Sequence, residues 1–285
     1  MRRHLLPASV LALAMSLFLA PAAASAITYG QIDSTNAYSN VGAFIVQSPS
    51  GLIFPLCSGT LIAPRVFLTA SHCTSYFTDV LQPRGYTAFV TFDASIPFGS
   101  MTSASTQLLP VAAAVTNPEY NQSQSDSGDI GALILAAAPV GIIPATLPAC
   151  GLLDQLAAKN GLKGATFTAA GYGVQNRVVG GGMPFFQDVN PVPRMYAFSS
   201  FLALNKGYLR LSQNPSTGDG GACYGDSGGP NFLTAGGTTY LVAITITGDA
   251  VCRATNVVYR LDTASAQRFL AYVNATFGVA IPTSC

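Results

Sequence analysis

The run Gly225-Asp-Ser-Gly-Gly-Pro230 places one serine, Ser227, among glycines. Such a backbone turns tightly and exposes both a hydroxyl group and neighbouring N–H groups. A serine hydroxyl is a weak nucleophile at its free pKa, so it needs a base beside it. The sequence holds two histidines, His4 and His72, and we expect the segment that contains His4 to be removed. His72 is therefore the imidazole base that we predict for Ser227.

An imidazole base needs a third group, usually a carboxylate, that fixes its tautomer and stabilises its charged form. Among the carboxylates between His72 and Ser227, Asp129 is followed directly by the apolar run Ile130-Gly-Ala-Leu-Ile-Leu135. A charge at the mouth of a buried strand can be held rigidly beneath an imidazole, so we favour Asp129. Asp126 is the nearby rival in a more polar context, and a turn-capping role is the alternative for Asp129.

These residues carry a family resemblance. Thr69-Ala-Ser-His72-Cys73, Asp129-Ile-Gly-Ala-Leu-Ile and Gly225-Asp-Ser-Gly-Gly-Pro230 follow one another in the order histidine, aspartate, serine. This pattern resembles the chymotrypsin/trypsin family of serine endopeptidases and is especially similar to its bacterial secreted members. The resemblance covers essentially the whole mature chain. It implies an all-β fold of two six-stranded antiparallel β-barrels with a C-terminal α-helix.

The resemblance also implies a role for each residue. Ser227 would attack the scissile carbonyl, His72 would take and then return the proton, and Asp129 would orient His72. The backbone N–H groups of Gly225 and Ser227 would form the oxyanion hole. The implied activity is peptide-bond hydrolysis through an acyl-enzyme.

Two alternative functions remain beside this one. A catalytically inactive binding protein on the same fold is the first, although such proteins usually lose a triad residue and none is lost here. The second is a serine esterase, because Gly225-Asp-Ser-Gly-Gly229 also fits the Gly-x-Ser-x-Gly turn of α/β-hydrolases. That fold needs its histidine after the serine, and no histidine follows Ser227. The esterase is therefore the weaker alternative.

The start of the mature chain has an expected partner near the nucleophile. Ile27-Thr-Tyr-Gly30 resembles the family's mature N-terminus, with Thr28 and Tyr29 in place of the more usual Val-Gly. In the family, a freed terminal ammonium pairs with the carboxylate equivalent to Asp226. We therefore expect Ile27 and Asp226 to form an activation pair once a signal peptidase exposes Ile27. Backbone amides alone are the alternative partners of Asp226.

Six cysteines in an exported chain suggest three disulfides. Counting alone allows about fifteen pairings. The family resemblance implies Cys57–Cys73 beside the histidine and Cys223–Cys252 across the substrate pocket. Cys150 and Cys285 are then joined by elimination, with a free Cys285 as the alternative.

The resemblance assigns a primary specificity pocket to Gly221, Ala222, Gly248 and Val257. Because Gly221 and Ala222 carry no charge, we predict an apolar rather than a basic P1 preference, with small or medium side chains favoured. Nearby Asp249 complicates this prediction. Ile246-Thr247-Gly248 resembles a pocket wall that is commonly Ser-Trp-Gly in the family, and this departure removes a serine hydroxyl that often supports the catalytic aspartate. Thr245 or Thr247 is a possible replacement.

The elements that must position these residues are mostly short strands. Strand-like runs recur along the chain, separated by turns rich in glycine and proline, which is typical of barrels or a sandwich. We expect one helix, at about residues 263–277. It has Asp262 or Thr263 as its cap and Gly278 as its end. The predicted runs are Val41–Val46, Thr60–Ile62, Val66–Thr69, Tyr86–Phe92, Ile130–Leu135, Thr166–Ala170, Met195–Phe201, Tyr208–Leu211, Thr239–Ile246 and Val257–Leu261.

The remaining sequence features indicate where the protein is located and which partners it has. Residues 1–26 read as a signal peptide, with Arg2 and Arg3 before an apolar stretch and small residues at its end. We divide the mature chain into an N-terminal barrel at 27–148 and a C-terminal barrel at 149–285. The net charge of +1 argues against a nucleic-acid partner. We expect a secreted monomer without cofactor or metal, off the membrane once the leader is removed. It would act on protein or peptide substrates and be open to protein protease inhibitors.

Overall fold

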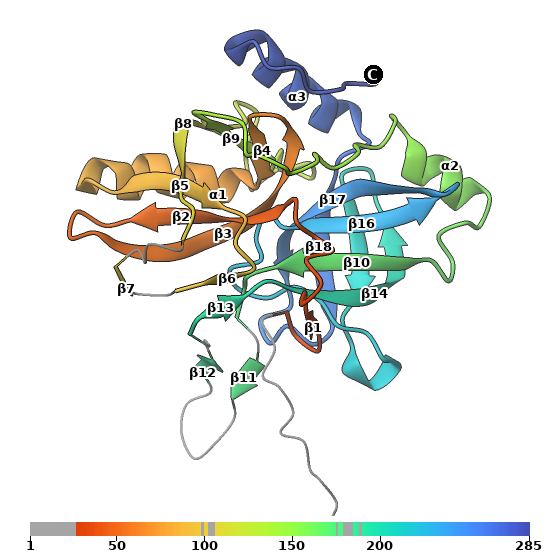
Figure 1. Cartoon of the computed structure of the whole chain (residues 1–285). Coiled ribbons are helices and arrows are strands. Elements are labelled where there is room, and N and C mark those ends of the chain that lie inside the picture. Colours follow the sequence, from red (N-terminus) through yellow and green to blue (C-terminus); the bar gives the residue numbers. More distant parts are fainter. Residues whose placement is uncertain (1–26, 98–99, 102–105, 175, 179–184, 188–189) are drawn as a thin grey trace, which may run out of the picture.

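The chain folds into two β-barrels with a helix at the C-terminal end (Figure 1). The computed structural model describes residues 27–97, 100–101, 106–174, 176–178, 185–187 and 190–285. The predicted leader, residues 1–26, lies outside the described residues. No helix in the described part of the chain is long and apolar enough to cross a membrane.

The first barrel carries the segments around His72 and Asp129. Its strands run in the order β2-β5-β8-β9-β4-β3, and pairing of β2 with β3 closes the ring. The short strand β7 extends this sheet at β3. The strands are β2 (Val41–Gln47), β3 (Leu52–Ala63), β4 (Val66–Thr69), β5 (Thr87–Thr91), β7 (Ser100–Met101), β8 (Leu109–Thr116) and β9 (Gly131–Leu135).

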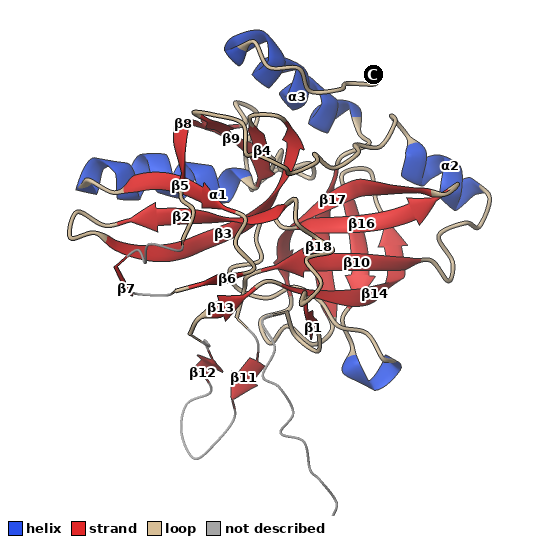
Figure 2. Cartoon of the chain, viewed as in Figure 1, coloured by secondary structure: helices blue, strands red, loops and turns tan. Residues whose placement is uncertain are grey.

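The second barrel carries the loop with Ser227. Its strands run in the order β14-β10-β16-β17-β18-β15, and pairing of β14 with β15 closes the ring. The two closed six-stranded antiparallel barrels confirm the predicted fold class (Figure 2). The strands are β10 (Thr166–Gly171), β14 (Met195–Leu204), β15 (Tyr208–Ser212), β16 (Pro230–Ala235), β17 (Thr238–Gly248) and β18 (Thr255–Arg260).

Short strand pairs lie outside the two rings. The strand β1 pairs with β14 at the edge of the second barrel, so the start of the described chain lies with the second barrel, although it precedes the first in sequence. The pair β6–β13 links a segment of each half of the chain. These strands are β1 (Gln31–Ile32), β6 (Ser95–Ile96), β11 (Asn176–Val178), β12 (Phe185–Gln187) and β13 (Val192–Pro193).

The helices are α1 (Ser71–Tyr76), α2 (Leu152–Ala158) and α3 (Ala264–Phe277). The predicted C-terminal helix matches α3. The Thr263 hydroxyl caps α3 by accepting a hydrogen bond from the Ala266 N–H group, and Gly278 ends it with a φ of 61°. The sequence did not predict α1 or α2. Helix α1 is one short segment of poor helix formers, so its tertiary contacts rather than its propensity stabilise it.

Two features join the barrels. Apolar side chains of both barrels and of α3 form one buried cluster, so the C-terminal helix covers a shared core. The fully buried Arg194 side chain also bridges them, because its guanidinium bonds Asp33, at 2.9 Å, and the carbonyl oxygens of Val41 and Phe92. A buried ion pair offsets its desolvation cost only when its other N–H groups also find hydrogen-bond acceptors, and those of Arg194 do. The loops of the two barrels are thus held in fixed relation.

Candidate active site

His72 and Asp129 meet at one end of the first barrel. The Nδ1 atom of His72 lies 2.9 Å from Oδ2 of Asp129. The backbone N–H of His72 donates to the other carboxylate oxygen, also at 2.9 Å. Two contacts to one residue fix the position of the carboxylate relative to the imidazole. The Asp129 side chain is 7% exposed and the His72 side chain 27%, so the imidazole keeps an open side.

A short hydrogen-bond chain holds this pair. His72 lies in the first turn of α1, and the preceding hydroxyl of Ser71 donates to the carbonyl of Ile130 at 2.7 Å. The same hydroxyl accepts from the N–H of Asn117. Because Ile130 follows Asp129 directly, these bonds join the histidine helix to the segment that leads from Asp129 into β9. The rigid strand mouth expected at Asp129 is therefore present.

The rival carboxylate, Asp126, is directed elsewhere. Its Oδ1 accepts from the hydroxyl of Tyr259 at 2.8 Å, and that tyrosine belongs to the second barrel. Neither Thr245 nor Thr247 contacts Asp129 among the described residues, so the expected replacement hydroxyl is absent there. Thr245 instead accepts hydrogen bonds from two asparagine side chains. Both hydrogen bonds to the Asp129 carboxylate therefore come from His72, one from its ring and one from its backbone N–H.

The Ser227 loop lies against β3, the strand that contains Ser58. The Ser58 N–H donates to the Ser227 carbonyl at 3.0 Å, and the Ser58 hydroxyl donates to the Gly225 carbonyl at 3.0 Å. Ser58 follows Cys57, whose disulfide partner Cys73 is the neighbour of His72. The described residues include no hydrogen bond between the Ser227 hydroxyl and His72. Such bonds are often long without substrate and tighten when it binds.

Two N–H groups of this loop are free to act as donors. Gly225 has a φ of 94°, a left-handed conformation that favours glycine. The carbonyl of Tyr224 accepts from the N–H of Val174 at 2.7 Å, which turns the following N–H of Gly225 the other way. Within the described part of the chain, the N–H groups of Gly225 and Ser227 have no acceptor. The two N–H groups that the sequence predicted as oxyanion donors therefore have no hydrogen-bond partner in this part of the chain.

Gly228, which follows the serine, allows the loop to sit this close to the first barrel. It has a φ of 77°, and a Cβ atom there would lie 2.1 Å from Oγ1 of Thr69 and 2.6 Å from the Ala70 nitrogen. No side chain fits between the serine loop and the strand before His72. The glycine-rich character of the motif thus follows from contact between the barrels.

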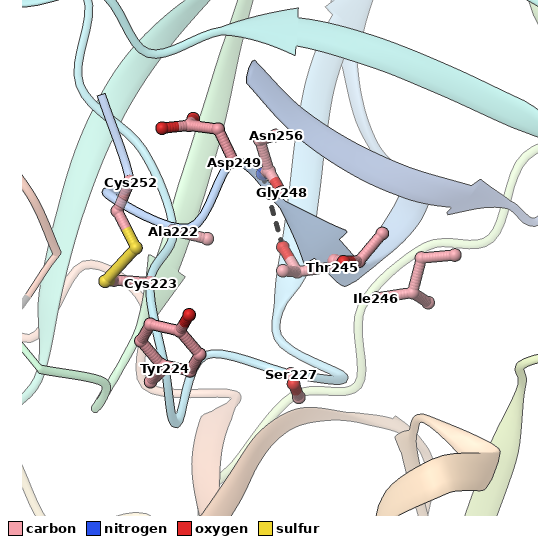
Figure 3. A pocket seen from close by; sticks show the side chains of 11 residues that line it. Ala222, Cys223, Tyr224, Ser227, Thr245, Ile246, Gly248, Asp249, Cys252 and Asn256 are labelled. Atoms are coloured by element: carbon pink, nitrogen blue, oxygen red, sulfur yellow. Dashed lines mark hydrogen bonds between the residues drawn. A yellow bond between two sulfur atoms is a disulfide. The ribbon is translucent and has the colours of Figure 1, made fainter. Parts of the chain in front are cut away.

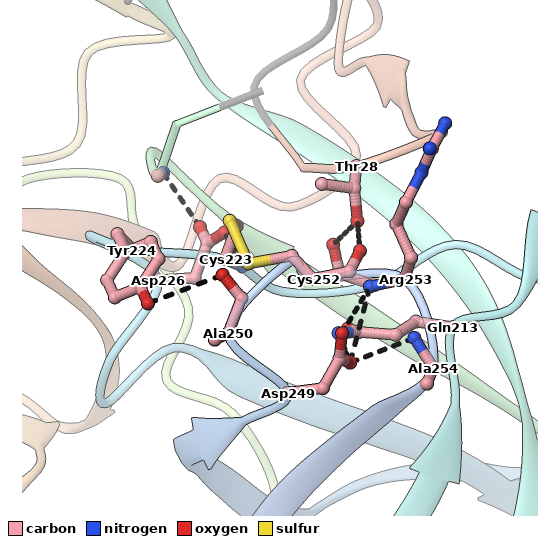
Figure 4. Close-up of a disulfide and its surroundings, with 12 residues drawn as sticks. Thr28, Gln213, Cys223, Tyr224, Asp226, Asp249, Ala250, Cys252, Arg253 and Ala254 are labelled. Carbon is pink, nitrogen blue, oxygen red and sulfur yellow. Dashed lines mark hydrogen bonds between the residues drawn. A yellow bond between two sulfur atoms is a disulfide. The ribbon is translucent and has the colours of Figure 1, made fainter. Parts of the chain in front are cut away.

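Asp226 is buried beneath the loop without a cation (Figure 4). Its carboxylate accepts from the N–H groups of Gly173 and Cys223, at 2.8 and 2.9 Å. Burial raises the pKa of Asp226 to about 7, and the two backbone hydrogen bonds lower it only in part. Among the described residues no basic side chain pairs with it. The structure therefore does not bring the predicted partners, Ile27 and Asp226, into an ion pair.

The segment that begins at Ile27 is nonetheless tied to the second barrel. The Ile27 side chain is fully buried beside Ala169 and Met195. Thr28 exchanges backbone hydrogen bonds with Gly221, and its hydroxyl contacts the carbonyl of Cys252 at 3.1 Å. Figure 4 shows Thr28 beside the Cys223–Cys252 disulfide. The segment that begins at Ile27 thus braces residues 221–223 of the chain, which lead to Ser227.

The structure contains the three disulfide pairs that the sequence led us to expect. They are Cys57–Cys73, Cys150–Cys285 and Cys223–Cys252. Sulfur atoms of the first pair and a ring nitrogen of His72 lie within 4.8 Å of one another. Because both sulfurs are in a disulfide, they supply no thiolate for a metal.

A pocket opens beside Ser227 in the second barrel (Figure 3). Its volume is about 150 Å³. The predicted residues Ala222 and Gly248 line it, but Gly221 and Val257 do not. The lining consists of Ala222, Cys223, Tyr224, Ser227, Thr245, Ile246, Thr247, Gly248, Asp249, Cys252 and Asn256.

Two side chains account for the difference from the predicted pocket. The buried Gln213 covers Gly221, because a Cβ atom on Gly221 would lie 2.4 Å from Oε1 of Gln213. Where β17 pairs with β18, an irregularity between Thr245 and Thr247 shifts the register, and Asn256 is the partner of Gly248. Asn256 therefore takes the place predicted for Val257.

Asp249 also lines the pocket, as its position in the sequence suggested. Burial raises the pKa of Asp249, but hydrogen bonds from the N–H groups of Arg253, Thr255 and Ala254 and from the Gln213 amide lower it below its usual value. The ionised Asp249 carboxylate thus holds residues 253–255 in place through their backbone N–H groups. Figure 3 shows its oxygens directed away from Ser227.

Comparison with known proteins agrees with this geometry. A family model described as Trypsin matches residues 31–269, well over half of the chain. No curated protein matches the sequence.

Proposed function

The chain belongs to the trypsin family of serine proteases, and we propose that it is a secreted endopeptidase in which Ser227, His72 and Asp129 form the catalytic triad. The observation that carries this proposal is the double contact between Asp129 and His72 beside a serine loop with two free N–H donors. Among the described residues, His72 is the one histidine.

Acylation would begin with attack of Ser227 Oγ on the scissile carbonyl. His72 accepts the hydroxyl proton at Nε2, because its Nδ1–H is held by Asp129. The carbonyl oxygen becomes an oxyanion that accepts from the N–H groups of Gly225 and Ser227. Loss of one such donor in related chemistry costs roughly 10²–10³ in rate. His72 then protonates the leaving amine, and the acyl group remains on Ser227.

Deacylation would repeat these steps with water as the nucleophile. His72 takes a proton from water while the hydroxide attacks the ester carbon, and it returns the proton to Ser227 Oγ as the acid product leaves. Asp129 remains ionised in both halves. The same two N–H donors hold the second oxyanion.

We also propose that removal of residues 1–26 exposes Ile27, whose ammonium then pairs with Asp226. The burial of Ile27 and the absence of a basic side chain beside Asp226 support this pairing. We assign residues 27–148 and 149–285 to the two halves of the enzyme. The mature protein would be a secreted monomer.

The pocket supports an uncharged P1 side chain over a basic one. No carboxylate lies at Gly221, and Gln213 occupies the space in front of it. A 150 Å³ cavity matches a benzene-sized group, so small and medium side chains fit. Protein or peptide substrates follow from the family, and protein protease inhibitors would dock on the same residues.

Hydrolysis of casein by the purified mature chain tests the proposed function. We expect cleavage by the wild type and its loss in Ser227→Ala, with the melting temperature of the variant unchanged to within a few degrees. Equal cleavage by both proteins would reject Ser227 as the nucleophile. A folded wild type that cleaves neither casein nor a mixed peptide library would instead favour the inactive binding protein.

A further inference from the structure

The specificity pocket ends at a polar side chain that faces no side chain across the sheet. Asn256 lies on β18 opposite Gly248 of β17. Directly opposite residues on neighbouring strands present their side chains to the same face of the sheet. Since Gly248 has no side chain, nothing on that strand covers Asn256 from the pocket, which both residues line. Figure 3 shows Asn256 beside Gly248, across the pocket from Ser227.

Its neighbours fix the orientation of the Asn256 amide. Nδ2 of Asn256 donates to Oδ1 of Asn231 at 3.3 Å and to Oγ1 of Thr245 at 3.4 Å. Asn231 is itself oriented, because its Nδ2 donates to the same Thr245 oxygen at 3.0 Å. A reversed Asn256 amide would set two carbonyl oxygens against each other. Among the described residues, Oδ1 of Asn256 accepts no hydrogen bond and remains available as an acceptor.

The Asp249 carboxylate of the pocket and the neighbouring Gln213 amide nitrogen already have hydrogen-bond partners. Asp249 accepts from three backbone N–H groups and from Nε2 of Gln213. Oε1 of Gln213 is buried and lies against Gly221, out of reach of a ligand. A basic P1 side chain that reached Asn256 would meet a neutral oxygen there, while the Asp249 carboxylate is directed away from Ser227 and held by its own donors, which is unfavourable for a buried charge. An apolar side chain would leave Oδ1 of Asn256 without water and without a donor, which is also unfavourable.

We propose that Asn256 is a specificity-determining residue that selects an uncharged P1 side chain carrying a hydrogen-bond donor, with glutamine preferred over the similarly shaped methionine. This inference rests on the proposed function. The glutamine amide donates one N–H to Oδ1 of Asn256, while its methylene groups contact the pocket wall. The pocket thus refines the apolar preference expected from Gly221 and Ala222.

Peptide substrates that differ only in the P1 residue test this proposal. For the wild type we expect kcat/KM to be about tenfold to a hundredfold higher with P1 glutamine than with P1 methionine, since an unpaired buried acceptor carries a penalty of that order. Asn256→Leu should bring this ratio to one or below. The control Gln267→Leu removes a buried amide on α3, far from the pocket, and should keep the wild-type ratio.

A second variant keeps the proposal testable if Asn256→Leu does not fold. Asn256→Asp places a carboxylate at the same point and should raise cleavage after lysine at least tenfold relative to methionine. The proposal is overturned if the wild type cleaves after methionine as fast as after glutamine, or if the glutamine preference survives in Asn256→Leu. Active-site titration with a fluorophosphonate accompanies each assay. A labelled enzyme without glutamine preference refutes this inference alone, whereas an unlabelled, inactive wild type refutes the proposed function.

Discussion

The proposed triad residues of the first barrel and the pocket of the second barrel are held in place by different sets of contacts. His72 and Asp129 are bonded to each other, the Ser71 hydroxyl joins α1 to the carbonyl of Ile130, and the Cys57–Cys73 disulfide ties α1 to β3. The pocket depends instead on side chains from separate strands, such as Gln213 on Asp249 and Asn256 on Asn231.

This difference separates chemistry from selectivity. A disulfide and several independent hydrogen bonds hold the helix that carries His72, so the position of His72 is maintained by the fold. Side-chain contacts are rewritten by single substitutions, so the pocket around Asn256 is free to change without moving the catalytic groups. Changes at the first site should therefore lower kcat, and changes at the second should mainly redistribute kcat/KM among substrates.

The largest expected effect comes from the aspartate of the triad. Asp129→Asn keeps the shape of the side chain but favours the wrong tautomer of His72, so we expect kcat to fall roughly 10⁴-fold at neutral pH. Steady-state kinetics with one peptide substrate measures this. The matched control Asp126→Asn changes a carboxylate three residues away that bonds Tyr259. A loss in the control as large as in Asp129→Asn would reject the assignment.

The next effect concerns the start of the chain. The pKa of Asp226 is raised from 3.8 to about 7 when no ammonium is beside it. The folded state then holds this proton more tightly than the unfolded state. Its contribution to stability is complete below pH 4 and is lost as the pH rises through 7. A chain with two residues before Ile27 should show this loss in urea unfolding between pH 4 and pH 8.

A chain that starts at Ile27 should escape this loss, because the new ammonium favours the ionised carboxylate. At pH 8 we expect it to be roughly a hundredfold to a thousandfold more active than the extended chain, since breaking a buried ion pair costs about 3–5 kcal/mol. Asp226→Asn is the control, and should remove the pH dependence in both chains. Identical unfolding and activity profiles would contradict the pairing of Ile27 with Asp226.

The smallest expected effect concerns Gly221, the predicted pocket residue that Gln213 covers. Gly221→Asp should not create cleavage after arginine, because Gln213 already occupies the space that the new side chain needs. Crowding should instead lower the unfolding free energy by about 1–3 kcal/mol. Adding Gln213→Gly to this variant opens the space and should let cleavage after arginine appear. Cleavage after arginine by the single variant would show that Gln213 does not cover Gly221.

The same contrast explains which features the sequence could predict. His72, Asp129 and Ser227 each lie in a short contiguous motif, so local spacing was enough to propose them, and the structure brings His72 and Asp129 together. The pocket was harder, because the irregularity between Thr245 and Thr247 moves Asn256 into the place expected for Val257. A one-residue change in register reverses which side chains face a pocket, and no local pattern encodes it.

Elements that depend on tertiary contacts were also missed. Helix α1 consists of residues with low helix propensity, and its Ser71 hydroxyl is bonded to Ile130, 59 residues further along the chain. The predicted helix α3 differs, since Thr263 and Gly278 mark both of its ends locally.

The most direct test of the central claim is covalent labelling of the mature wild-type chain by a fluorophosphonate, followed by mass mapping of the labelled peptide. We predict a single label on Ser227, absent from Ser227→Ala and formed far more slowly by His72→Ala because the hydroxyl then lacks its base. A label on another residue, or an undiminished rate in His72→Ala, would contradict the triad.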